Sequence, residues 1–466
     1  MRALPAVVAV VFGIVLVGAT PAFSDGATPG ADVQVAQTLG DRDLTLIIRR
    51  AGRPPAPLRV DVVTHAGTPP GRLELRASTA GETVSTTKVD LGVTPGFYRG
   101  TLRVDRVGPW ELAVDDGAQA ATIPFVVPAL VASPWENAVY GGFTAAGALL
   151  FVALGLAVFG RIGFALVSAG GVVAALATAI TAGALAPAIP SPPAPGTHLD
   201  PTFDTVGHPY RRTSMTDFSR PPVNLTVGMD GADLRLRLTD GSSGRPVDDL
   251  LVHNDALIHL VVVSPSGGMR HLHPIRVAPG DYRARLNPSE PGAYAVAGEL
   301  ARRGGGVQLL RSSALVGAVA SSPEHQGNAR LEKSAGPDGA GRPPVELTKA
   351  VRPAGTPSTI MAAFGSPTLQ PWLGMIGHMI VVGPVDDTQT PVTAPIWAHV
   401  HAMLPSSPGY PDRPDESVAT FGPDIRFTYT FPSPGTYLAW VQAERDYSVI
   451  TVPTVVDVPA AEGPRG

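Results

Sequence analysis

The sequence predicts a mainly β protein of three β-sandwich domains, with a two-helix transmembrane hairpin between the first and the second. Three observations predict this class. A strand-turn-strand pattern that ends in an aromatic-bearing strand recurs three times along the 466 residues. Two long apolar runs without charge lie between the first and second copies. The chain is also long enough for three domains of about 100 residues plus membrane segments.

The N-terminus has the three parts of a secretory signal. Arg2 precedes an apolar run over residues 3–17, and the small residues Ala22 and Ser24 stand ahead of Asp25. We therefore expect the first domain to be exported. The chain has no cysteine, which excludes disulfides, thiolate metal sites and cysteine nucleophiles. Its net charge of −4 and the lack of a long basic stretch argue against nucleic acid as a partner.

The two uncharged runs, residues 138–160 and 162–189, are each long enough to cross about 30 Å of hydrocarbon as a helix. Only Arg161 separates them. Because positive residues favour the cytoplasmic side, the turn is predicted to lie there, while Glu136 and Asp200 flank the outer ends. We thus expect a plasma-membrane protein in contact with lipid, whose folded domains lie on the extracytoplasmic side. Small residues would allow close helix packing, at Gly141, Gly142, Gly147, Gly155, Gly163, Gly170 and Gly171.

The internal repeat defines the domains. GFYRGTLRVDRVGPWELAV from Gly96 aligns with GDYRARLNPSEPGAYAVAG from Gly280, and the third copy reads DIRFTYTFPSPGTYLAWV from Asp424. Alternating residues, a Pro or Gly turn and an aromatic-bearing strand are typical of the later hairpin of a β-sandwich. We expect the aromatic residues, such as Trp110 and Tyr294, to belong to the core.

Stretches rich in proline and polar residues mark two linkers between these domains. The predicted organisation is a signal peptide over 1–24, a β-sandwich without metal motif over 25–133, transmembrane helices over 138–160 and 162–189, a linker over 190–222, a β-sandwich with His-x-His over 223–318, a linker over 319–345, and a second β-sandwich with His-x-His over 346–460.

A hairpin-like stretch in the second domain carries three histidines. It reads HLVVVSPSGGMRHLHP and begins at His259. In a strand alternate side chains share a face, so His271 and His273 point the same way. If residues 264–268 form the turn, His259 lies opposite His273, with paired Cβ atoms roughly 4.5 to 5.5 Å apart. Three imidazoles are therefore predicted to converge on one patch of sheet.

The third domain repeats this arrangement in HMIVVGPVDDTQTPVTAPIWAHVHAM, although its loop is longer. His378 is predicted to lie opposite His401, with Ile380 opposite His399. A single exposed His-x-His is more often surface decoration than a metal site, but six of the eleven histidines occupy matching places in two copies. This duplication favours metal binding.

Imidazole suits zinc, copper, iron and nickel, whereas a thioether is a soft ligand that favours Cu(I). Each His-x-His has a methionine two residues away on the same face, Met269 in the second domain and Met403 in the third. We therefore predict copper, with zinc less favoured. His253 is the best additional ligand, and Asp255 is an outer-shell candidate, although Asn254-Asp255 indicates a turn.

The first domain lacks the histidine pattern. In LRVDVVTHAGTPPGRLELRAS, Arg59 falls at the position of His259, and Leu73 and Leu75 replace the His-x-His alternation. His65 is then alone, and we expect no metal of this kind to bind there. A role in spacing or in docking to a partner is predicted instead.

Over residues 248–310 the chain resembles the YtkA-like secreted domains, and more loosely so over 372–445. The resemblance rests on VHNDALIHLVVVSPSGGMRHLHP, EPGAYAVAGEL and GGGVQ. It implies an immunoglobulin-like β-sandwich and an association with heavy metals, often copper. By this resemblance His253, His259, His271 and His273 are candidate ligands. The third domain departs from the pattern, with Ala402 in place of the proline and no counterpart of His253.

Two hypotheses follow. The first is a membrane-anchored protein that captures copper outside the membrane and buffers it, or delivers it to a membrane or secreted metalloprotein, from hairpins exposed at the surface. The alternative is a structural or accessory ectodomain that docks a membrane partner and binds no metal, with histidines that are solvated or respond to pH. No carboxylate stands next to either motif as a general base, and no hydrolase motif occurs, so we expect no enzymatic activity.

Overall fold

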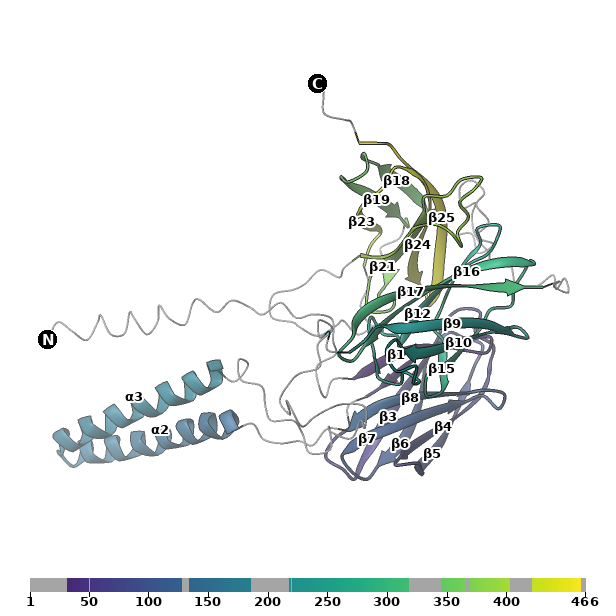
Figure 1. The fold of residues 1–466 in the computed structure, drawn as a ribbon. Helices are drawn as coiled ribbons and strands as arrows, with labels where there is room; N and C mark the ends of the chain where they lie inside the picture. The colour runs from purple at the N-terminus through teal and green to yellow at the C-terminus, as the bar shows by residue number, and fades with distance from the viewer. Residues whose placement is uncertain are drawn as a thin grey trace, which may run out of the picture.

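The structure is a computed structural model that describes residues 32–49, 51–127, 134–185, 218, 220–317, 345–365, 369–402 and 421–461. Within these residues the protein is mainly β, with six antiparallel sheets and two long helices (Figure 1). The predicted signal peptide, Met403 and most of both predicted linkers lie outside the described residues. The strands fall into an N-terminal segment (32–127), a central segment (220–317) and a C-terminal segment (345–461), with two sheets in each.

In the N-terminal segment one sheet has the order β1-β2-β3-β6, and the other has the order β5-β4-β7-β8. The strands are β1 (Val33–Leu39), β2 (Arg42–Ile48), β3 (Ala56–Thr64), β4 (Gly71–Thr79), β5 (Glu82–Leu91), β6 (Gly96–Val104), β7 (Gly108–Asp115) and β8 (Ala120–Val127). Buried residues alternate with partly or fully exposed ones along β4, β6 and β8, as expected for strands with one face in a core.

In the central segment the orders are β14-β15-β10-β9 and β11-β16-β12-β13, with β17 also paired to β16. The strands are β9 (Val223–Asp230), β10 (Asp233–Asp240), β11 (Leu250–Leu251), β12 (Ile258–Val263), β13 (Met269–Leu272), β14 (Ile275–Ala278), β15 (Asp281–Arg285), β16 (Gly292–Arg302) and β17 (Gly306–Val316). All six residues of β12 are buried, so both faces of this strand are covered.

In the C-terminal segment the orders are β18-β19-β23 and β20-β24-β21-β22, with β25 paired to β24. The strands are β18 (Glu346–Ala350), β19 (Pro357–Ala363), β20 (Leu369–Gln370), β21 (Gly377–Gly383), β22 (Ile396–Ala402), β23 (Asp424–Thr430), β24 (Gly435–Arg445) and β25 (Ser448–Val458). Ile360 and Phe427 of the first sheet share one apolar core with Met379 and Val441 of the second. The two sheets therefore form two layers around this core.

The repeated aromatic residue has the same role in each segment. Trp110, Tyr294 and Tyr437 are buried, as predicted, and each donates a hydrogen bond to the backbone carbonyl four residues earlier. The two strands of the repeat do not pair as a hairpin, however. In each segment the first strand lies in one sheet and the second in the other, as β15 and β16 do. The repeat is thus a connection between two layers.

The topology also corrects the predicted correspondence within the N-terminal segment. In the central segment β12 pairs with β16 and β13. The equivalent strand of the N-terminal segment is β4, which pairs with β7 and β5, whereas β3 lies in the other sheet and pairs with β2 and β6. With Trp110 matched to Tyr294, the residue at the position of His259 is Glu74, which lies opposite Lys88. The assignment of Arg59 to that position was therefore wrong, because the apolar pattern alone does not tell which sheet a strand joins.

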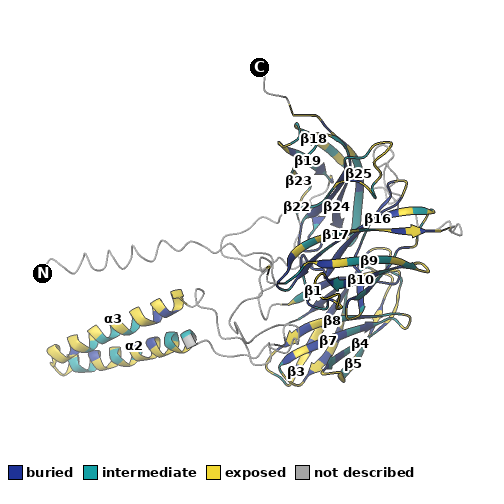
Figure 2. Ribbon diagram, viewed as in Figure 1, coloured by how far each residue is buried: buried dark blue, intermediate teal, exposed yellow. Residues whose placement is uncertain are grey.

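The two apolar runs form α2 (Pro134–Val158) and α3 (Ile162–Leu185), joined at Arg161 and lying side by side (Figure 1). By length and composition both could span a membrane. Both helices carry many exposed apolar side chains, such as Phe151 and Phe164, and they are mostly yellow and teal in Figure 2, whereas the strands carry more of the dark blue of buried residues. Of the predicted packing glycines, Gly142 and Gly171 lie at the contact. A Cβ added to Gly142 would lie 2.8 Å from the Ala175 carbonyl oxygen.

Candidate metal centre

The strand registers bring together the histidines of each hairpin. In the central segment Ser264 and Gly268 close the predicted turn, and Leu260 pairs with Leu272, which places His259 opposite His273. In the C-terminal segment His378 pairs with His401 and Ile380 with His399. Both predicted registers are confirmed.

Each set of three offers one ligand nitrogen per imidazole, and within a set these nitrogens all lie within 4.8 Å of one another. We call His259, His271 and His273 the central triad, and His378, His399 and His401 the C-terminal triad.

The two triads are not on separate exposed hairpins, as predicted, but adjoin each other inside the molecule. The sheet that carries β12 and β13 packs face to face on the sheet that carries β21 and β22. One end of this contact is an apolar cluster that includes Val261, Val263, Ile380, Val382 and Trp440. The histidines form the other end. His259 and His378 are 1% and 0% exposed, so the expectation of surface exposure was wrong.

Hydrogen bonds orient the central triad. His259 Nε2 lies 3.0 Å from the His253 carbonyl oxygen, to which it donates, and so its Nδ1 carries a lone pair. His271 Nδ1 donates to Gln442 Oε1 at 3.0 Å, because the amide nitrogen of Gln442 is bound to Thr451. The lone pairs of His259 Nδ1 and His271 Nε2 then face each other across 3.2 Å. Two nitrogens bound to one tetrahedral ion at about 2.0 to 2.1 Å are separated by roughly 3.3 Å.

The C-terminal triad has the same arrangement. His378 Nε2 donates to the Trp372 carbonyl oxygen at 3.0 Å, which leaves the lone pair on Nδ1. His399 Nδ1 lies 3.4 Å from the carboxylate of Glu299, and a proton held on this nitrogen by the negative charge leaves the lone pair on Nε2. His378 Nδ1 and His399 Nε2 face each other at 2.9 Å. In each triad two members therefore present converging lone pairs, and their opposite nitrogens face a carbonyl, amide or carboxylate oxygen, as is usual for metal-bound histidine.

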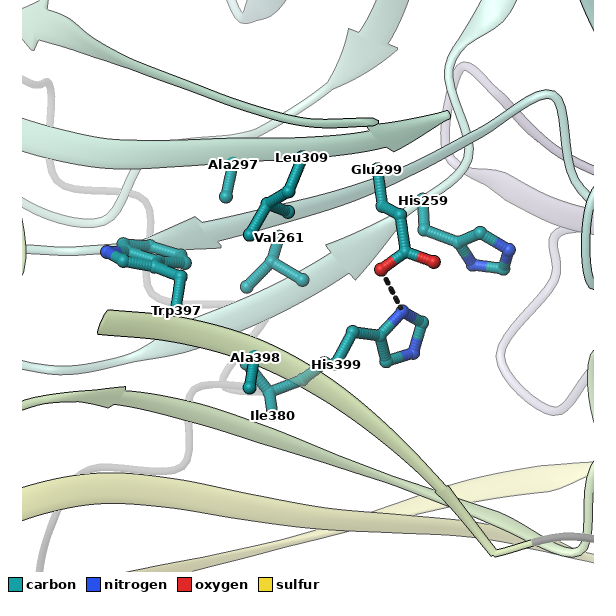
Figure 3. Close-up of a pocket in the computed structure, with 9 residues that line it drawn as sticks. All are labelled: His259, Val261, Ala297, Glu299, Leu309, Ile380, Trp397, Ala398 and His399. Carbon is teal, nitrogen blue, oxygen red and sulfur yellow. Dashed lines mark ion pairs between the residues drawn. The ribbon is translucent and has the colours of Figure 1, made fainter. Parts of the chain in front are cut away.

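Two of these orienting residues lie at equivalent positions and were not predicted. Glu299 of β16 pairs with His259, and Gln442 of β24 pairs with His378. Each reaches across to the other segment, Glu299 to His399 and Gln442 to His271. Figure 3 shows Glu299 between His259 and His399 in a pocket at the contact. A single polar residue within an otherwise apolar stretch of a strand, as in AYAVAGEL and YLAWVQA, is the signal that could have identified both.

Burial keeps four of the imidazoles neutral. It lowers the pKa of His259, His273 and His378 well below the usual value, and that of His271 to about 3, with further lowering by neighbouring histidines. Burial alone would raise the pKa of Glu299, but hydrogen bonding to His253 and His399 outweighs it and lowers that pKa. At neutral pH the site thus combines these four neutral imidazoles with the Glu299 carboxylate, and neutral imidazole is the form that binds a metal.

Of the remaining predicted ligands, Met269 and His253 lie outside the triads, and Met403 is not among the described residues. The thioether of Met269 packs in the apolar cluster with Val263. The ring centroid of His253 is 6.5 Å from that of His259, and His253 Nε2 lies 3.3 Å from Glu299 Oε1, so His253 lies beside the triad and next to Glu299. Asp255 lies in the turn, with a positive φ, as the sequence indicated.

The N-terminal segment borders the site. The Thr38 amide donates to the His273 carbonyl at 2.6 Å, and the His273 amide donates to Thr38 Oγ1 at 2.9 Å. His65 Nδ1 lies 2.5 Å from Glu444 Oε1. Burial lowers the pKa of His65, but the charge of Glu444 outweighs it and raises that pKa. This segment therefore docks within its own chain.

The comparisons with known proteins assign no activity to this chain. The family described as "Domain of unknown function (DUF8832)" matches residues 343–460, which include the C-terminal triad. No curated protein matches the chain.

Similar solved structures include a tetra-tandem repeat of a large adhesion protein, at 10% identity over 92% of this chain and 75% of that one, with a TM-score of 0.15. Salmonella alpha-2-macroglobulin matches at 10% identity over 93% of this chain and 24% of that one, with a TM-score of 0.18. The bacterial integrin-binding protein invasin matches at 11% identity over 89% and 60%, with a TM-score of 0.15. This chain spans about a quarter of the macroglobulin, and scores this low carry no functional argument.

Proposed function

We propose that this chain is a membrane-anchored extracytoplasmic metal-binding protein that captures copper and buffers it or delivers it to a partner. One observation carries the proposal. In each triad two imidazole nitrogens that bear lone pairs face each other at 3.2 or 2.9 Å, a distance suited to two ligands of one ion. Without a cation two such lone pairs repel, so the arrangement is better explained by binding than by packing.

Copper is favoured over zinc by the ligand type. Imidazole binds both metals, but the affinity of a nitrogen site for divalent first-row ions is highest for Cu²⁺. Since Met269 packs in the apolar cluster, the preference for copper within the described residues rests on the imidazoles and not on the thioether of Met269.

The architecture supports a location outside the membrane. Two sheets in each segment, and the hydrogen bonds of Tyr294 and Tyr437 to carbonyls four residues earlier, are typical of immunoglobulin-like sandwiches. Arg161, in the turn between the two apolar helices, favours the cytoplasmic side for that turn and the outer side for all three segments. The resemblance to YtkA-like secreted domains points the same way.

Burial of the histidines favours slow release of a bound ion, as in a buffer, over rapid exchange with the solvent. His273 and His378 are almost fully buried, so an ion can leave only when the contact between the sheets opens. We expect slow release to a chelator and faster release to a membrane or secreted metalloprotein that opens this contact.

The test is a copper titration of the full chain in detergent, as Cu(II) and as Cu(I), each against a competing chelator. The variant changes His271, His273, His399 and His401 to alanine, and the matched control is His325→Ala. Tight binding with a fixed stoichiometry in the wild type and in the control, lost in the fourfold variant, is expected. Weak binding that the fourfold variant retains would reject the proposal in favour of an accessory ectodomain that docks a partner without metal.

A further inference from the structure

The two triads lie as close to each other as their own members do. Between triads, the ring centroids of His271 and His399 are 5.2 Å apart, and those of His259 and His399 are 5.1 Å apart. Within the central triad, the rings of His259 and His273 are 5.4 Å apart. The six imidazoles thus form one continuous cluster.

The cluster has approximate two-fold symmetry. His271 and His399 hold equivalent positions in the two hairpins and face each other across the contact. The crossed contacts of Glu299 and Gln442 obey the same symmetry. A contact of this kind joins the same surface of two related units, so two equivalent sites lie at equal distances from the axis.

The space between the triads is shared. One pocket is lined by His259 and Glu299 of the central segment and by His399 of the C-terminal segment (Figure 3). Glu299 also contacts both segments directly, through His253 and His399. An ion in either triad would therefore lie in the field of the same carboxylate.

From this geometry, and resting on the proposed function, we infer that the two triads form one dinuclear copper centre in which each triad holds one ion and the two ions interact. The two ions share one carboxylate, and their mutual repulsion rises with the product of their charges. Two Cu(II) ions therefore repel each other about four times as strongly as two Cu(I) ions at the same distance. The second Cu(II) binds at least tenfold more weakly than the first, and this gap is smaller for Cu(I).

The experiment uses the full chain in detergent and follows stepwise addition of Cu(II) by electron paramagnetic resonance beside a binding isotherm. At one equivalent we expect the spectrum of an isolated ion. At two equivalents we expect two bound ions and a spectrum that is broadened or lost through spin coupling. The variant with His399 and His401 changed to glutamine should bind one ion and keep the isolated spectrum at any loading. His325→Ala is the control.

Other outcomes separate this inference from the proposed function. Two bound ions with two independent, unbroadened signals would overturn the dinuclear centre and leave copper binding intact. One ion per chain, lost when either triad is changed, would overturn it as well, since a single ion would then be shared by both triads. Absence of binding in the wild type would remove both. Because the wild-type spectrum alone decides the coupling, a variant that fails to fold does not compromise the test.

Discussion

The central and C-terminal triads share their strand geometry but differ in the groups around them. His259 and His378 each donate to the carbonyl of the residue six positions earlier, which is His253 in one segment and Trp372 in the other. The residue paired with the first histidine is Glu299 in one and Gln442 in the other.

The backbone orients His259 and His378, since each donates to a main-chain carbonyl that is present whatever the side chain of that residue. The side chains at the two equivalent positions set the charge. The Glu299 carboxylate lies 3.3 Å from His253 Nε2 beside the central triad, whereas the Trp372 ring packs against His271 and His378. The negative charge therefore belongs to one half of a nearly symmetric site.

The largest effect is expected from removing one triad at a time. Changing His271 and His273, or in a separate variant His399 and His401, to alanine should remove one of two bound ions. The affinity of the altered triad should fall by more than about 100-fold, because loss of outer-shell partners alone costs 10- to 100-fold. Isothermal titration of the two variants side by side measures this. Equal retention of both ions in either variant would contradict the assignment.

Acid should destabilise the metal-free protein through the central triad. Burial lowers the pKa of His259, His271 and His273, so below pH 6.5 the unfolded chain binds protons that the folded chain does not. Stability is therefore fully present above that pH and is lost as the pH falls, by up to about 1.4 kcal/mol per pH unit for each histidine. Urea unfolding between pH 7.5 and 5 measures the slope.

The matched variant for this prediction replaces His271 and His273 with glutamine, which keeps a polar side chain but does not titrate. Its slope should be clearly smaller. The pair of His65 and Glu444 has the opposite sign, because the raised pKa of His65 gives stability below pH 6.5 that is lost at higher pH. An unchanged slope in the glutamine variant would mean that other groups control the acid response.

Substitution of Glu299 or Gln442 should directly alter the charge difference between the two halves of the site. Glu299→Gln makes the two halves alike and should lower the Cu(II) affinity by about 10- to 100-fold, because it removes the carboxylate beside His399. Gln442→Glu instead gives both halves a carboxylate and should raise the Cu(II) affinity, mainly for the second ion. Competition against a chelator measures both variants, and a fall in affinity with Gln442→Glu would contradict the role of charge.

The smallest effect is expected at Met269. Because its side chain packs in the apolar cluster, Met269→Leu conserves volume and should cost less than about 1.5 kcal/mol of stability. The Cu(I) affinity should not change. A Cu(I) titration combined with thermal unfolding checks both quantities, and a selective loss of Cu(I) binding would restore the thioether as a ligand.

The sequence by itself determined the local part of this protein. Alternation along a strand and the length of a turn fix which side chains share a face, and so the pairing of His378 with His401 was predictable. The uncharged runs likewise predicted α2 and α3. The placement of His259 opposite His273 followed from the turn over residues 264–268 alone.

Only the tertiary structure decided that the two triads are one buried cluster. The face-to-face contact joins strands more than 100 residues apart, and no local pattern in either hairpin predicts the surface on which that hairpin packs. The same contact brings Glu299 to His399, covers the histidines from water and leaves Met269 among apolar side chains. Periodicity within a strand states which face is buried, but the partner of that face is set by packing over the whole chain.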